Sequence, residues 1–246
     1  MKGEALRHDF GSGEVAAYRW INADGRAGGI VAASATIADS ARISGGARIG
    51  DGAIIGYRAS IGAYARIGAY ARIGDGSSIG DRAVIGDEAT IGDGAIIGNR
   101  AVIGDGAIIG DGAIIGYRAS IGDETTIGDG ASTGLRVSIG FRASIGDMAF
   151  IGCGASIGDG ASIGDGDWYI SGGPCGSRGA TWTAVHSREH GLRWWVGCQR
   201  GISTEALLER VQAEHGDNDH ARAYRHAVQC VTTHPEYLRR VAAQAE

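Results

Sequence analysis

The sequence predicts an all-β solenoid in which very short strands stack coil upon coil, and three observations lead to this prediction. From residue 37 to residue 163 every sixth position is isoleucine, with Thr133 as the single exception. Two residues before each of these positions stands a small residue, which is alanine in most repeats. A three-residue turn, most often Gly-Asp-Gly, separates each isoleucine from the next small residue, so the consensus reads I-G-D-G-A-x.

The six-residue period fits a short strand that alternates with a tight turn. The glycines of each repeat would destabilise a helix by about 1 kcal/mol apiece relative to alanine. In a strand A-x-I, alanine and isoleucine point to one side and residue x points to the other. Glycine and aspartate tolerate the backbone angles of turns. A strand this short is not stable alone, so it must pair with the strand of the next coil.

The repeat unit "IGDGAI" resembles the hexapeptide-repeat family over about residues 31–166. The resemblance implies a left-handed triangular parallel β-helix with three hexapeptides, or 18 residues, per coil. A second pattern supports the 18-residue coil. Two residues after isoleucine, aspartate recurs every 18 residues at positions 75, 93, 111, 129, 147 and 165. The corresponding positions of the other two repeats in each coil are less regular. About seven coils are expected.

Three parts are expected along the chain. Residues 1–30 lack the period and are predicted to cap the first coil, residues 31–166 form the β-helix, and residues 167–246 form a small α+β module. In the module, "TWTAVHS" and "LRWWVGC" alternate like the arms of a hairpin. "STEALLERVQAEHG" has the cap and stop signals of a helix that ends at Gly216. A second helix is expected after Asp217 or Asn218, and a third from Pro235.

Composition limits the cellular context. The net charge of -5 gives no strong reason to expect nucleic-acid binding, and no apolar run is long enough to span a membrane. The first residues do not read as a secretion signal, so a cytoplasmic protein is expected. The four cysteines include no CxxC pair. The segments "GSRGATWTAV" and "GLRWWVGCQRG" resemble the C-terminal module of uncharacterised phage and prophage β-helical proteins, which leaves association with a virion open.

Histidine placement bears on catalysis. The hexapeptide-repeat resemblance implies acyltransferases that use a histidine as general base, or carbonic anhydrases with three histidine zinc ligands. All seven histidines lie outside residues 31–166, at positions 8, 186, 190, 215, 220, 226 and 234. The zinc site is therefore excluded. An acyltransferase would need a histidine from the C-terminal module of a neighbouring chain.

The C-terminal module offers one weak metal-site candidate. His215, Asp217 and His220 are close in sequence, and Cys198 could join them. The alternative is that Asp217 or Asn218 caps a helix while the histidines are solvated. We expect no metal and no cofactor.

A column of arginines is the main candidate binding site. With 18 residues per coil, Tyr64, Arg82, Arg100, Arg118 and Arg136 stack at the second position of one turn. Most other turns have glycine there, so this edge is expected to use a different turn geometry. The arginines either are solvated and partly compensated by carboxylates such as Asp81, or form a spine that binds phosphate or an acidic polymer.

Residue x of each strand faces outward and predicts an interface in the middle coils. Early coils place arginine there and late coils place serine. The middle coils place apolar residues, and Ile96 pairs with Ile114 and Val84 with Val102 on two faces. A homotrimer is expected. The predicted interface residues are Val84, Ile96, Val102, Ile108, Ile114, Tyr117, Leu135 and Phe141.

These observations favour a non-catalytic structural or interaction protein, a rigid scaffold that presents its C-terminal module to an unknown protein partner. Two alternatives stay open. One is a hexapeptide-class acyltransferase with its histidine outside the repeats. The other is a binding module for an anionic ligand along the Arg82–Arg136 edge.

Overall fold

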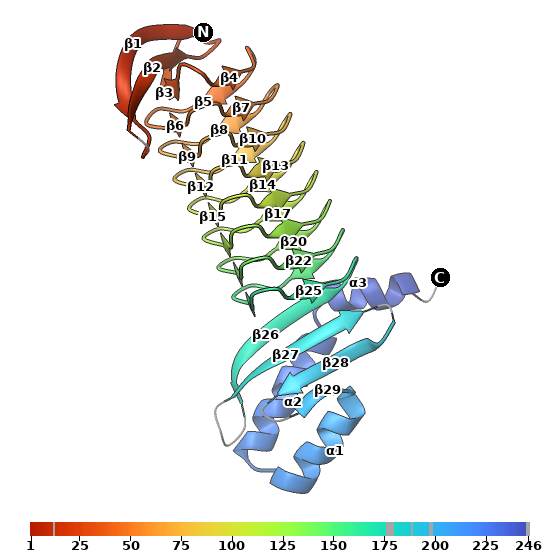
Figure 1. Ribbon diagram of the computed structural model, residues 1–246. Coiled ribbons are helices and arrows are strands. Elements are labelled where there is room, and N and C mark those ends of the chain that lie inside the picture. Colours follow the sequence, from red (N-terminus) through yellow and green to blue (C-terminus); the bar gives the residue numbers. More distant parts are fainter. Residues whose placement is uncertain (12, 176–179, 188, 197–198, 245–246) are drawn as a thin grey trace.

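The computed structural model describes residues 1–11, 13–175, 180–187, 189–196 and 199–244. Stacked coils form a prism, with an N-terminal hairpin at one end and a helical module at the other (Figure 1). The predicted fold class is confirmed as a left-handed parallel β-helix with a small C-terminal module. The second of its three sheets contains eight strands, so the solenoid has about eight coils instead of the expected seven.

Each side of the prism is one sheet, and the chain visits the second, third and first sheets in turn. The first sheet comprises β1 (Lys2–Asp9), β2 (Glu14–Ile21), β3 (Ala27–Ala32), β6 (Arg48–Ile49), β9 (Arg66–Ile67), β12 (Val84–Ile85), β15 (Val102–Ile103), β18 (Ser120–Ile121), β21 (Ser138–Ile139) and β24 (Ser156–Ile157). The second comprises β4 (Thr36–Ile37), β7 (Ile54–Ile55), β10 (Arg72–Ile73), β13 (Thr90–Ile91), β16 (Ile108–Ile109), β19 (Thr126–Ile127), β22 (Ser144–Ile145) and β25 (Ser162–Ile163).

The third sheet continues past the coils into the C-terminal module. It comprises β5 (Arg42–Ile43), β8 (Ser60–Ile61), β11 (Ser78–Ile79), β14 (Ile96–Ile97), β17 (Ile114–Ile115), β20 (Ser132–Thr133), β23 (Phe150–Ile151), β26 (Trp168–Cys175), β27 (Ala180–Ser187), β28 (Gly191–Val196) and β29 (Gln199–Ile202). Strands β26 to β29 are antiparallel to one another. The same sheet therefore joins the solenoid to the module without a linker.

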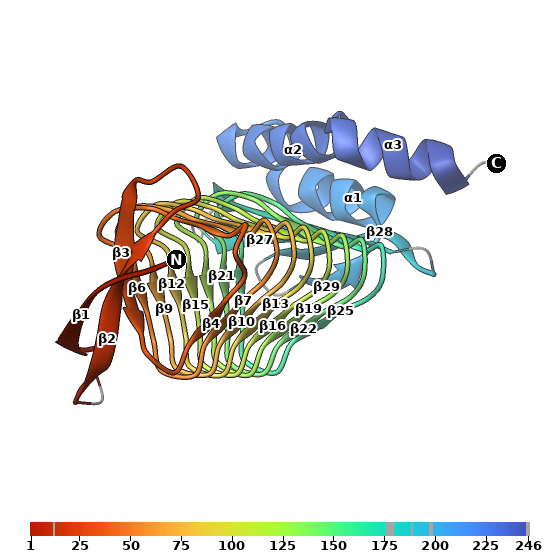
Figure 2. The same ribbon diagram turned by 90° about the horizontal axis from the view of Figure 1, so that it is seen from above.

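Isoleucine and alanine line the interior of the prism. The isoleucines stack one coil apart, as Ile97 does on Ile115, and both are about 1% exposed. The ladder between coils holds them in register, for example through the Ile96 amide, which donates to the Ala113 carbonyl at 2.8 Å. Figure 2 looks down on the stack at an angle and shows the successive coils as a staggered row of similar loops. Burial of this continuous apolar lining is the main stabilising contribution to the solenoid.

The turn aspartates have a structural role between coils. The Asp93 carboxylate accepts a hydrogen bond from the Asp75 amide at 2.7 Å, and Asp111 accepts from the Asp93 amide at 2.8 Å. Each carboxylate thus satisfies a backbone N–H of the preceding coil that no strand partner reaches. This pairing explains the aspartate columns as turn chemistry, and no group of three potential ligands for a metal ion occurs among the described residues.

Thr133 interrupts both the isoleucine lining and the ladder. Its hydroxyl oxygen accepts the Gly116 amide at 3.1 Å, and the strand pairing between β17 and β20 is reduced to Ile114 with Ser132. The side chain is 3% exposed and satisfied, so the position is a local rearrangement of the core.

The two ends of the solenoid are covered. At the N-terminal end the Asn22 side chain donates to the Ile43 carbonyl and accepts from the Ile43 amide, both at 2.9 Å, and so satisfies the edge of β5. At the other end α1 (Thr204–His215) packs beside β28, α2 (Asp219–Thr232) packs beside β26, and α3 (Pro235–Gln244) contacts α2. Ser203 and Asn218 are the N-caps of α1 and α2, and Gly216 ends α1, as the sequence predicts. None of the described helices is long and apolar enough to cross a membrane.

Candidate functional site

The arginine column lies along one edge of the prism, where the chain turns from the third sheet to the first. We call this edge the third–first corner; its turns are residues 62–65, 80–83, 98–101, 116–119 and 134–137. Arg82, Arg100, Arg118 and Arg136 have φ between 56° and 60°, and Gly112 in another corner has φ 63°. The expectation of a different turn geometry is wrong. The Arg100 amide donates to the Asp81 carbonyl at 2.9 Å, and such bonds between coils impose the same left-handed turn on every residue type.

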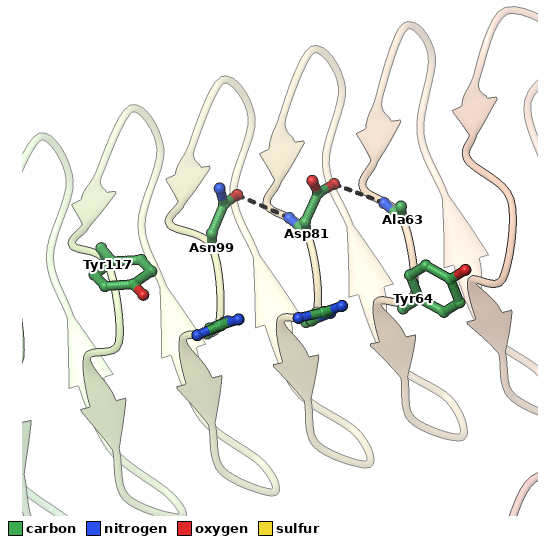
Figure 3. A pocket seen from close by; sticks show the side chains of 7 residues that line it. Ala63, Tyr64, Asp81, Asn99 and Tyr117 are labelled. Carbon is green, nitrogen blue, oxygen red and sulfur yellow. Dashed lines mark hydrogen bonds between the residues drawn. The ribbon is translucent and has the colours of Figure 1, made fainter.

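A cleft of about 370 Å³ opens at this corner. It is lined by Ala63, Tyr64, Asp81, Arg82, Asn99, Arg100 and Tyr117. Figure 3 shows Tyr64 and Tyr117 at its two ends, with Asp81 and Asn99 on the turns between them. The structure thus unites Arg82 and Arg100 in one site, whereas Arg118 and Arg136 continue the column outside the lining of the cleft.

The cleft contains cationic groups that no described carboxylate neutralises. Arg82 and Arg100 take part in no ion pair among the described residues, whereas Arg142 at the first–second corner binds Glu124, which raises the pKa of that arginine. Asp81 does not bind Arg82, contrary to the compensation that the sequence suggested. Its Oδ1 atom accepts the Ala63 amide at 2.7 Å.

This corner is also poor in acidic residues. The turn position that holds aspartate elsewhere is occupied here by Ala63, Asp81, Asn99, Tyr117, Leu135 and Cys153. Asn99 reproduces the aspartate hydrogen bond, because its side-chain oxygen accepts the Asp81 amide at 2.8 Å, but it carries no charge. The hydrogen bond between coils is retained while the negative charge is removed, which leaves a positive potential along the edge.

Aromatic rings accompany the guanidinium groups. The Arg82 guanidinium lies 5.9 Å from the centre of the Tyr64 ring, and that of Arg118 lies 5.1 Å from the Tyr117 ring. Such contacts hold a guanidinium in place without a counter-ion. Two arginines with two tyrosines can accept a phosphate group and an adjoining planar group.

The predicted interface residues are partly gathered around the same corner. Val84 pairs with Val102 on the first sheet and Ile96 with Ile114 on the third. Tyr117 and Leu135 lie on turns of the corner itself, whereas Ile108 lies on the second sheet and Phe141 at the first–second corner. The more exposed of these side chains have between 41% and 53% of their surface free: Ile96, Val102, Ile108, Ile114, Leu135 and Phe141.

The C-terminal candidates take part in other contacts, although the rings of His215 and His220 adjoin. The Asp217 carboxylate binds Arg225 at 2.9 Å. The His215 ring stacks on Tyr224, and its centre lies 5.6 Å from that of the His220 ring. Cys198 lies outside the described residues. Two other histidines lie close to residues of the solenoid or its hairpin. The His234 ring is 6.2 Å from that of Phe150, and the His8 ring is 4.7 Å from that of Phe10.

Comparison with protein families identifies the class of the repeats. Residues 58–92, 70–105 and 88–123 match the model described as bacterial transferase hexapeptide (six repeats). The solenoid is therefore built of hexapeptide repeats, as the resemblance in the sequence implies. The match contradicts the prediction of a non-catalytic scaffold, because the repeats correspond to those of a transferase family.

Solved structures with similar coils include acyltransferases. One is a mutant of perosamine N-acetyltransferase from Caulobacter crescentus in complex with CoA and GDP-perosamine, at 20% identity and a TM-score of 0.34. The alignment covers 62% of this chain and 54% of that one, so the chain spans about half of its length. Another is UDP-N-acetylglucosamine acyltransferase from Francisella novicida, at 18% identity and a TM-score of 0.34, with 82% of this chain and 89% of that one covered. No curated protein matches the sequence.

Proposed function

We propose that the protein is an acyltransferase of the hexapeptide class, and that the cleft at the third–first corner holds the phosphate groups of its acyl donor, a CoA thioester. One observation carries the proposal. Every residue that lines the cleft, from Ala63 to Tyr117, lies within the segment that matches the transferase repeat.

The cleft has the chemistry that this donor requires. Arg82 and Arg100 present two guanidinium groups, which bind phosphate oxygens in pairs. Tyr64 and Tyr117 present ring faces on which an adenine can stack. The coils contain no histidine, so the base that accepts the proton of the attacking amine or hydroxyl is a histidine outside the repeats, supplied by another copy of the chain. The nitrogen or oxygen of the acceptor forms a bond to the thioester carbonyl carbon, the C–S bond breaks, and the protonated histidine gives its proton to the sulfur, so CoA leaves as the thiol.

Binding of acetyl-CoA tests the cleft. Arg82→Gly with Arg100→Gly installs the residue that most other corners use at this position, so the fold is retained. We expect acetyl-CoA to bind the wild type saturably in calorimetry, and the double variant about tenfold or more weakly, since each charge-assisted hydrogen bond contributes roughly 1.5–3 kcal/mol. Arg58→Gly is the matched control, because Arg58 has φ 56° at another corner.

Acyl transfer to a panel of amines and sugar alcohols, followed by release of free thiol, tests the reaction. Turnover that the Arg82/Arg100 variant loses and the Arg58 variant keeps would support the proposal. Saturable binding of CoA without transfer to any acceptor would contradict the transferase and leave the cleft as an anion-binding site.

We also propose that the protein is a homotrimer. Exposed apolar residues flank the cleft on both adjoining sheets, and burying them against another copy removes their contact with water and brings a second chain to the cleft. Light scattering should give three times the 25.2 kDa chain mass, about 76 kDa. Ile96→Asp with Ile114→Asp should give a monomer, whereas Ser144→Asp with Ser162→Asp on the second sheet should not. A monomeric wild type would refute the trimer.

A further inference from the structure

A second cleft lies where the tip of the β1–β2 hairpin meets the first sheet. Its volume is about 230 Å³, and the residues that give it chemical character are Phe10, Arg48, Arg66, Val84, Asp87 and Asp105. Figure 1 shows the hairpin running beside the first coils instead of extending away from them. The site lies on the first sheet and at its border with the second, and it shares no lining residue with the cleft at the third–first corner.

Two arginines stand side by side on the floor of this cleft. Arg48 and Arg66 are direct partners in the parallel pairing of β6 and β9, and both side chains point outward. Like charges at directly opposed positions of a sheet repel each other. Neither guanidinium forms an ion pair with a carboxylate in the part of the chain that the structure describes. An anion placed between them would relieve the repulsion.

The two aspartates that line the cleft are engaged by the backbone. The Asp87 carboxylate accepts the Ala69 amide at 2.7 Å, and Asp105 accepts the Asp87 amide at 2.8 Å. These two carboxylates line the cleft beside the arginines and therefore disfavour a long polyanion there. A small anion that fits between the arginines avoids them.

The aromatic wall of the cleft is held in place by its own turn. The Asp9 carboxylate accepts hydrogen bonds from the Gly11 amide at 2.7 Å and the Gly13 amide at 3.0 Å, and these bonds lower the pKa of Asp9. The His8 ring contacts Phe10 edge-on, with 4.7 Å between ring centres. Across the hairpin, Arg7 donates to the Glu14 carbonyl at 2.8 Å. Phe10 is therefore positioned over the sheet before any ligand arrives.

We propose that this cleft binds a small organic anion, a carboxylate or phosphate monoester with an apolar or aromatic body. The anionic group lies between Arg48 and Arg66, and the body packs between Phe10 and Val84. The site is independent of the proposed acyl transfer, since it uses none of the residues assigned to the acyl donor.

Phenyl phosphate is the probe, and inorganic phosphate is the comparison. Arg48→Ser with Arg66→Ser places in these coils the residue that Ser120, Ser138 and Ser156 already provide on the same sheet, so the fold tolerates it. In calorimetry we expect phenyl phosphate to bind the wild type saturably and this double variant about tenfold more weakly. Phe10→Ser should weaken phenyl phosphate but leave inorganic phosphate unchanged, because only the former has a body to pack.

Two controls separate this site from other arginines. Arg72→Ser removes an outward arginine of the second sheet and should bind phenyl phosphate like the wild type. The Arg82→Gly with Arg100→Gly variant removes any binding at the other cleft and should keep the binding that depends on Arg48 and Arg66. The proposal is overturned if the wild type shows no saturation by about 10 mM, an affinity too weak for a formed site. Unchanged affinity in the Arg48/Arg66 variant, or a loss confined to the Arg82/Arg100 variant, would overturn it equally.

Discussion

Replacing Gly110 with alanine is expected to lower the free energy of unfolding by about 3 kcal/mol or to prevent folding, because the added methyl group overlaps the next coil. A β-carbon at Gly110 would lie 2.6 Å from the Asp129 nitrogen and 2.6 Å from the Gly128 carbonyl carbon. These are backbone atoms, and they cannot move aside as a flexible side chain does. The Gly110 amide itself donates to the Ile127 carbonyl at 2.7 Å, so separating the coils would break the ladder.

Gly112→Ala provides the control, two residues away in the same turn. A β-carbon there meets no atom within 4 Å, but φ is 63°, so the cost is the left-handed conformation, about 1 kcal/mol. Denaturant unfolding of both variants at one protein concentration measures the difference. If Gly112→Ala were the more destabilising of the two, close approach of the coils would not be what requires glycine at position 110.

The Ile121→Asp substitution should be at least as damaging, with an expected loss of about 4 kcal/mol or more at neutral pH. Ile121 is 1% exposed in the lining of the prism. The polar side chains that the lining does contain are bonded to the backbone, as where the Ser77 hydroxyl donates to the Gly74 carbonyl at 2.8 Å and that of Thr125 to the Gly140 carbonyl at 2.7 Å. A carboxylate can only accept, and the ladder already uses the amides around it.

The pH dependence of this variant has a definite sign. Burial raises the pKa of the new carboxyl group above its unfolded value, so the folded state binds more protons and the loss of stability grows as pH rises. The deficit should therefore shrink as pH is lowered toward 4. Ser120→Asp, whose side chain faces water, should change stability by no more than about 0.5 kcal/mol. Equal losses for the two neighbours would show that the inward and outward faces are not distinguished.

Much of the fold could be predicted from sequence because the coil is a local, repeated structure. The isoleucine period predicts the strands and the 18-residue aspartate pattern predicts how they stack, since identical residues meet one coil apart. The helix caps of the C-terminal module are also local signals, and Ser203 and Asn218 fill them. The turn geometry at Arg82 was not predictable from residue preference. Hydrogen bonds between coils impose φ 58° on Arg82, although arginine rarely adopts this left-handed conformation.

The sites were only partly predictable. The arginine column follows from the 18-residue period, and Tyr64 belongs to the same column, but the limits of the cleft depend on where Tyr117 ends it. Arg48 and Arg66 are visible as outward arginines of early coils. Nothing local indicates that Phe10 would lie over them, because that contact depends on how a hairpin remote in sequence packs on the first sheet.

By itself, the sequence determined a solenoid of stacked coils with an isoleucine interior, since a six-residue period that puts Ala and Ile on one side leaves stacked coils as the way to bury them. The tertiary structure alone decided which arginines share a cleft. It placed Arg82 with Arg100 between two tyrosines, left them without a carboxylate partner in the described chain, and brought Phe10 to Arg48 and Arg66. The physical reason is that periodicity fixes contacts between neighbouring coils, whereas a cleft is closed by side chains from non-equivalent positions whose packing no repeat encodes.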